Sequence, residues 1–271
     1  YSGNDAYHFA FSVACLSLVV SILIYYAFRS TFRHVEGTSA DKVNETGEVV
    51  ELSRQETRER IIALVLVFAV VIFFWMAFQQ NGLTLTFFAD EFTAKSATGW
   101  QGMSFNVLNL VAIILIVYAA FALFQSKTSK GRLIALGVID LACCVLGYEY
   151  TQIDGAVEVS APIFQQFNAC FVVMLTPVSI ALFSWLAKKG KEPKAPVKIG
   201  LGMLVAGAAY LLMTVSSIGL PATDHPNHVA DVTPNLLITT YLILTFAELL
   251  LSPIGISLVT KVAPPKYKGM M

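Results

Sequence analysis

The sequence predicts an all-α protein, built as a polytopic bundle of membrane helices. Hydrophobic residues fill 56% of its 271 positions and charged residues only 13%, a composition typical of integral membrane proteins. Irregular backbone cannot cross lipid, so each apolar stretch of membrane length is expected to be a helix. Seven such segments lie at about 7–28, 60–88, 104–125, 132–150, 162–187, 198–219 and 234–261.

The charges of the connecting loops alternate along the chain. The basic loops comprise residues 29–60, 126–132, 188–198 and 261–271, which hold all 18 Lys and Arg residues except Lys95. By the positive-inside rule these loops are cytoplasmic, so we expect Tyr1 outside and Met271 inside. The formal net charge is zero, which gives no electrostatic reason to expect a nucleic-acid partner.

The first segment is expected to be a true membrane span. It is too long for the apolar region of a signal peptide, and no charged region precedes it. A polar linker follows. It is expected to become helical near Ser53, because Ser53 and Glu56 have the spacing of a capping box.

The second segment, 60–88, carries an unusual run of amides. Trp75, Gln79, Gly82 and Thr86 recur at spacings of 4, 3 and 4 and so share one helix face. Gln79 begins a run of three amides, and each amide needs a hydrogen-bonding partner within a membrane. Contacts between helices and the lining of a solute pathway are both compatible with this pattern.

The next three helices differ in polarity. The hairpin 104–150 is nearly uniformly apolar and is expected to lie outside any solute pathway, with Asp140 paired or near the cytoplasmic boundary. The segment 162–187 places Gln165 and Asn168 close to one face. Asn168 has the same two interpretations as the amide run. The segment 198–219 is rich in Gly and Ala, which favours close packing between helices.

The last segment, 234–261, holds one carboxylate, Glu248, near its middle. At ~1.5 Å of rise per residue Glu248 lies about 20 Å from either end, near the midplane of a hydrocarbon core about 30 Å thick. An ionisable group there costs roughly 2.5 to 3.5 kcal/mol and usually faces a bundle interior or a water-filled path. The alternative is a neutral Glu that is hydrogen-bonded for packing alone. The helix face that carries Glu248 also carries Tyr241, Thr245, Ser252 and Gly255.

No catalytic or metal-binding constellation is evident. The four cysteines lie in apolar segments without the spacing of a metal site or a disulfide framework. The spans contain no evident pair of nucleophile and base. We therefore expect a protein that is not an enzyme and that uses no cofactor and no metal.

Three motifs resemble the proton-dependent oligopeptide transporter (POT) family, a branch of the major facilitator superfamily. Residues 74–82 read FWMAFQQNG, similar to the family's seventh-helix pattern. Residues 164–168 read FQQFN, similar to the Phe-Gln-x-x-Asn of its eighth helix. Residues 247–255 read AELLLSPIG, similar to the Gly-Glu-Leu-Leu-x-Ser-Pro-x-Gly of its tenth helix, and this match is the most specific of the three.

The resemblance implies a partial major facilitator superfamily fold with an extra two-helix hairpin. Residues 1–33 would hold the sixth helix, which belongs to the amino-terminal half, and 34–59 a cytoplasmic linker. Residues 60–271 would form part of the carboxyl-terminal half, with an inserted hairpin at 104–150. Helices seven to ten are then expected at about 60–88, 162–187, 198–219 and 234–261. We therefore expect a fragment that needs the remaining helices of the transporter as partners and cannot transport by itself.

The resemblance also implies a function and a site. The expected activity is secondary transport of di- and tripeptides by proton symport in a bilayer, with the inner membrane of a bacterium as the expected location. Glu248 and Asn168 would hold the peptide amine, Trp75 would line the pocket, and Glu248 would couple protons. The expected substrate-binding set is Glu248, Asn168, Trp75, Gln79, Gln165, Ser252 and Tyr241.

Three features depart from the family pattern. Many members have an acidic residue at the position of Gln79, and Ala169 follows Asn168 where Pro is usual. The hairpin follows the seventh helix, whereas bacterial members carry one between the sixth and seventh. The alternatives are a transporter of another small zwitterionic or anionic solute, or a membrane receptor or scaffold that does not transport.

Overall fold

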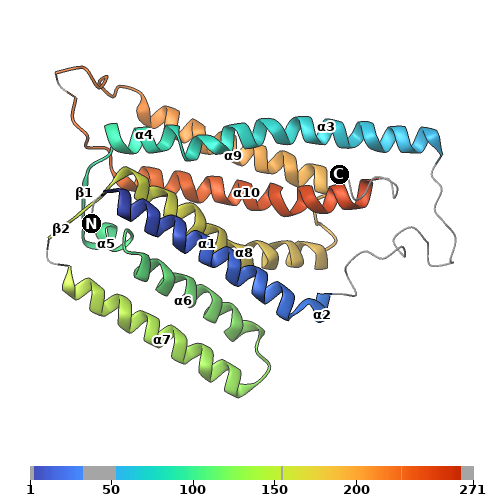
Figure 1. The fold of residues 1–271 in the computed structure, drawn as a ribbon, viewed down its shortest axis with the longest axis horizontal. Coiled ribbons are helices and arrows are strands. Elements are labelled where there is room, and N and C mark those ends of the chain that lie inside the picture. The colour runs from blue at the N-terminus through green and yellow to red at the C-terminus, as the bar shows by residue number, and fades with distance from the viewer. Residues whose placement is uncertain (1–2, 33–52, 154, 227, 264–271) are drawn as a thin grey trace. The chain divides into compact units, whose positions relative to one another are not determined.

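The structure is a computed structural model, and it describes residues 3–32, 53–153, 155–226 and 228–263 (Figure 1). The chain divides into two compact units. One comprises Tyr1–Ile61 with Ala263–Met271, and the other comprises Ile62–Val262. The expected linker 34–59 lies largely outside the described residues.

The smaller unit contains α1 (Gly3–Ala27), α2 (Arg29–Phe32) and the start of α3 (Arg54–Phe78). The capping box predicted for α3 is confirmed. The Ser53 backbone N–H donates to Glu56 Oε2 at 3.0 Å, and the Glu56 N–H donates to Ser53 Oγ at 3.1 Å. These bonds satisfy two N–H groups that the first turn of a helix leaves without partners.

The larger unit is an all-α bundle, as the sequence predicts. After α3 come a 3₁₀ turn, η2 (Gln79–Asn81), and α4 (Thr84–Glu91). The remaining long helices pack in the order α9, α10, α8, α6 and α7 (Figure 1). Their bounds are Val107–Gln125 for α6, Ser129–Gln152 for α7, Gln165–Lys188 for α8, Ala195–Ser217 for α9 and Pro234–Val262 for α10.

Six helical segments among the described residues are long and apolar enough to cross a membrane. They begin at Arg54, Val107, Ser129, Ala161, Ala195 and Pro234. In α1 the described apolar stretch, Phe11–Ala27, is shorter than these six. The protein is therefore an integral membrane protein, with these six helical segments as candidate spans among the described residues.

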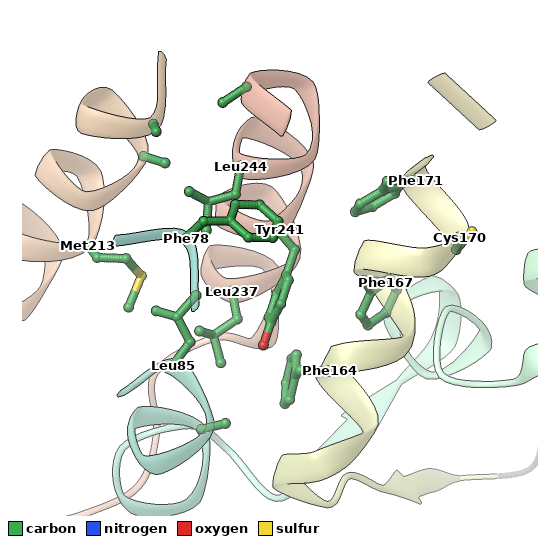
Figure 2. Close-up of a cluster of buried hydrophobic side chains, with 14 of the residues drawn as sticks. Phe78, Leu85, Phe164, Phe167, Cys170, Phe171, Met213, Leu237, Tyr241 and Leu244 are labelled. Atoms are coloured by element: carbon green, nitrogen blue, oxygen red, sulfur yellow. The ribbon is translucent and has the colours of Figure 1, made fainter. Parts of the chain in front are cut away.

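The core of the larger unit lies where α10 meets α4, α8 and α9 (Figure 2). Tyr241 extends from α10 towards Phe164, which belongs to the short 3₁₀ helix η3 (Ala161–Phe164) before α8. On the other side of α10, Leu237 lies beside Leu85 of α4 and Met213 of α9. These contacts fix α10, the helix that carries Glu248, against three neighbours.

The helices α9 and α10 approach closely at Gly202. A Cβ atom at this position would lie 3.0 Å from the carbonyl oxygen of Ala247 and 3.4 Å from Cβ of Leu250. Small residues at such contacts let two helix backbones come together, and close packing is a main source of helix association in lipid. The Gly- and Ala-rich α9 therefore serves to hold α10 in place.

The helical hairpin of α6 and α7 is joined to the bundle by a short β-ribbon. Strand β1 (Ser96–Thr98) pairs antiparallel with β2 (Ala156–Glu158), with Ala97 opposite Val157. The helix α5 (Gly99–Met103) follows β1, and Trp100 stacks on Tyr150 at 4.8 Å. The all-α prediction does not include this ribbon, which is too short for a sequence pattern to reveal.

Asp140 differs from its expected placement. It lies near the middle of α7 and its side chain is exposed. The ion pairs in the described part of the chain are Lys95–Asp90 and Lys198–Glu192, and neither involves Asp140.

Candidate functional site

Glu248 is hydrogen-bonded to the neighbouring helix through Asn168. The Asn168 Nδ2 atom on α8 donates to Glu248 Oε2 at 3.2 Å and to Thr245 Oγ1 at 3.1 Å. Thr245 in turn donates its hydroxyl hydrogen to the Tyr241 carbonyl oxygen at 2.7 Å. We call Asn168, Thr245 and Glu248 the carboxylate cluster.

The carboxylate cluster presents acceptors rather than donors. Its two donating groups, the Asn168 amide and the Thr245 hydroxyl, are already engaged within the protein. An amide nitrogen has two hydrogens, and both are used here, so Asn168 can offer only its oxygen to a ligand. Together with the carboxylate of Glu248, which is half-buried, this oxygen suits a cationic donor such as an ammonium group.

The local sequence of α10 explains this placement. Thr245 precedes Glu248 by three residues and follows Tyr241 by four, so all three share one helix face. Thr245 and Tyr241 are completely or almost completely buried, whereas Glu248 and Ser252 are half-buried. The polar stripe expected on α10 therefore leads from the core of the larger unit towards an accessible surface.

The segment expected as one continuous helix at 60–88 is broken. It turns into the 3₁₀ helix η2 at Gln79 and resumes as α4 at Thr84. Buried Tyr241 and half-buried Tyr210 bind carbonyl oxygens beside the break. The Tyr241 hydroxyl donates to the Asn81 carbonyl at 2.7 Å, and the Tyr210 hydroxyl to the Ala77 carbonyl at 2.7 Å. Such partners make a break tolerable within a membrane, because freed backbone groups must be satisfied.

Gln165 joins α8 to the helix after this break. Its Nε2 atom donates to Thr86 Oγ1 at 3.2 Å and to the Gly82 carbonyl oxygen at 3.4 Å. Of the amide run, Gln80 accepts from Thr84 Oγ1 at 2.6 Å, and Gln79 is exposed. Gln165 therefore links two helices, whereas the side-chain bonds of Gln80 are local along its own segment, so both interpretations of the amide run stay open.

The predicted site residues are not all in contact. The structure brings Asn168 and Glu248 into direct contact, and Tyr241 joins them through Thr245. Trp75 packs edge-on against Phe74 and Phe78 at 5.7 and 5.5 Å. The hydrogen bonds of the carboxylate cluster do not include Gln79, Gln165, Trp75 or Ser252.

Sequence reasoning missed the roles of Thr245 and Tyr210. Thr245 holds Asn168 beside the carboxylate, and its spacing of three residues from Glu248 is the signal that could have identified it. Tyr210 stands within a segment that the sequence indicates only as packing, and nothing in the local pattern relates it to Ala77. The contact depends on the tertiary arrangement of α3 and α9.

A separate groove of about 390 Å³ lies between α4 and α9. Its hydroxyl groups are occupied. Thr214 donates to the Tyr210 carbonyl oxygen at 2.8 Å, Ser217 to the Met213 carbonyl oxygen at 2.7 Å, and Thr84 to Gln80. The groove is therefore mainly apolar, and it lacks the charged group that a zwitterionic solute needs. Its lining is Thr84, Leu85, Phe88, Tyr210, Met213, Thr214, Ser217 and Ile218.

Comparisons with known proteins relate part of this chain to a transporter family. Residues 150–271 match the sequence profile of the POT family. The peptide transporter YePEPT of Yersinia enterocolitica is 33% identical over 168 residues, which are 60% of this chain and 29% of that protein. A di-/tripeptide transporter of Lactococcus lactis is 24% identical over 98% of this chain and 52% of its own length. Residues 150–271 of the chain are thus similar to the POT family.

The likeness to curated transporters extends over nearly the whole chain. The uncharacterized transporter YclF of Bacillus subtilis is 26% identical over 97% of this chain and 50% of its own length. A crystal structure of a sulfate-bound mutant POT peptide transporter covers 97% of this chain and 51% of its own, at 22% identity and a TM-score of 0.41. The chain thus spans about half or less of the length of these relatives.

Proposed function

We propose that this chain forms part of a transporter that carries di- and tripeptides by proton symport, and that Glu248 and Asn168 hold the peptide amine. The contact between Glu248 and Asn168 is the observation that carries the proposal. A carboxylate within a membrane supplies the counter-charge for an ammonium group, and an amide oxygen accepts a further hydrogen bond. The match of residues 150–271 to the POT family supports peptides as the substrate class.

The proposal also covers the solute pathway and the membrane location, by analogy with the same relatives. We propose that the solute pathway is formed by the six described candidate spans and α1 together with further helices. Transporters of this kind bind solute between two helix bundles that rock against each other. Residues 1–33 would then belong to the amino-terminal half and residues 60–271 to the carboxyl-terminal half. Trp75, Gln79, Gln165, Ser252 and Tyr241 would line the pathway around the carboxylate cluster. The basic loops support a cytoplasmic membrane location with Tyr1 outside.

Uptake into liposomes tests the proposed transport. The full-length protein is reconstituted, an inward proton gradient is imposed, and entry of a labelled dipeptide is followed. We expect accumulation above the external concentration, and we expect a protonophore to abolish it. Uptake that stops at equal concentrations regardless of the gradient would contradict proton symport, and an absence of dipeptide uptake would contradict peptide transport.

The same assay tests the position of Gln79. An amide does not titrate, so the proposal assigns proton loading to Glu248. Gln79→Ala is therefore expected to retain gradient-driven accumulation, within a few-fold of the parent rate. If this variant still exchanges dipeptide across the membrane but no longer accumulates it, proton coupling depends on Gln79 and the assignment to Glu248 is wrong.

A further inference from the structure

The loop between α8 and α9 has a fixed shape. The helix α8 ends in a Schellman motif, in which the Lys191 N–H donates to the Leu186 carbonyl at 3.0 Å and the Gly190 N–H to the Ala187 carbonyl at 2.9 Å. Gly190 has a φ of +65°, a conformation that the motif requires and that glycine adopts without strain. The side chains of this loop are therefore displayed from a defined backbone.

This loop displays an uncompensated positive charge. Lys188, Lys189, Lys191 and Lys194 are all exposed. The one acidic residue between 188 and 198 is Glu192, and its Oε1 atom lies 2.5 Å from Nζ of Lys198. Lys198 is only 8% exposed and lies 4.1 Å over the ring of Phe183. Because Lys198 already balances Glu192, the four exposed lysines have no acid within the loop to neutralise them.

An exposed tryptophan lies beside these lysines. Trp185 is one turn before the end of α8, and 52% of its surface is exposed. The Nζ atom of Lys189 lies 3.8 Å from the centre of its ring. Tryptophan favours the depth of the lipid headgroups, with its ring in the apolar layer and its N–H in the polar one. This pair therefore sets the lysines at headgroup level.

We propose that Lys188, Lys189, Lys191 and Lys194 form a binding surface for the headgroups of anionic phospholipids. Lysines in the last turn of a helix also complement the helix dipole, but Lys191 and Lys194 lie beyond the end of α8. Clusters of basic residues next to a membrane span attract anionic lipids through the charge of the membrane surface. This inference does not depend on Glu248 or on the transported solute.

Lipid titration of the full-length protein tests the proposal. The protein is placed in phosphatidylcholine nanodiscs containing increasing phosphatidylglycerol, and the bound phosphatidylglycerol is counted by native mass spectrometry after gentle extraction. We expect the variant Lys189→Gln with Lys191→Gln to bind phosphatidylglycerol about tenfold or more weakly, since each lysine at an anionic surface contributes roughly fivefold. The charge-retaining pair Lys189→Arg with Lys191→Arg should bind like the parent.

A matched control comes from the loop between α6 and α7. Lys127 and Lys130 are also exposed in a short basic loop, so changing both to Gln removes the same charge elsewhere. We expect this control to change binding less than threefold. Equal losses in the two Gln variants would overturn the proposal, because binding would then follow net charge alone. A parent protein without preference for phosphatidylglycerol over phosphatidylcholine would overturn it as well.

Discussion

Replacing Glu248 by Gln is expected to weaken the binding of a free-amine dipeptide by about 1.5 to 3 kcal/mol, roughly 10- to 150-fold in dissociation constant. The change keeps the shape of the side chain and removes its charge, so the substrate ammonium would lose a charge-assisted hydrogen bond. The Asn168 amide can still donate to the side-chain oxygen of the substituted residue, so the contact between α8 and α10 should persist. Isothermal titration of the full-length protein measures the effect.

The chain offers a closely matched control for this variant. Glu149 on α7 accepts a hydrogen bond from Asn106 Nδ2 at 3.2 Å, the same distance and the same pair of groups as Glu248 with Asn168. Glu149 lies in the hairpin, which we place outside the pathway. Glu149→Gln should therefore leave the dissociation constant within about twofold of the parent. An unchanged affinity in Glu248→Gln would rule out its contact with the substrate amine.

Replacing Gly202 by Val is expected to lower the free energy of unfolding by about 1 to 3 kcal/mol, the usual cost of overpacking. Any Cβ atom at this position meets the Ala247 carbonyl oxygen at 3.0 Å, and a backbone oxygen cannot rotate away as a side chain can. The helices α9 and α10 would have to separate, and Ala247 precedes Glu248 directly. The measurement is the thermal or denaturant unfolding of the full-length protein in detergent.

Gly200 provides the control on the same helix. A Cβ atom at Gly200 would meet nothing within 4 Å, so Gly200→Val changes the same residue type without a clash. Both variants alter the intrinsic helix propensity of α9 equally, and their difference isolates the packing against α10. If the two proteins unfold at the same denaturant concentration, the close approach of α9 and α10 at Gly202 does not contribute to stability.

The carboxylate cluster could be predicted in part from the sequence. The depth of Glu248 and the helical spacing of its stripe follow directly from the apolar pattern, because a helix fixes which residues share a face. The pairing with Asn168 could be predicted only through the family motifs, since the sequence of one helix does not determine which neighbouring helix it faces. Thr245 was recognised as part of the stripe but not as the group that holds Asn168.

The break at Gln79–Asn81 illustrates what periodicity cannot reveal. The apolar pattern continues across residues 60–88, so it indicates one helix. The break is stabilised by Tyr210 and Tyr241, whose hydroxyls lie on helices more than a hundred residues further along the chain. The pairing of β1 with β2 depends likewise on contacts that local sequence does not encode.

The central claim is that Glu248 recognises a positively charged amine. It is tested most directly by comparing a free dipeptide with its N-acetylated form in the parent protein and in Glu248→Gln. The parent should prefer the free amine by about tenfold or more, because acetylation removes the charge that the carboxylate binds. In Glu248→Gln this preference should fall to about twofold or less. A preference for the free amine that remains as large in the variant as in the parent would contradict the account, because a group other than Glu248 would then bind the amine.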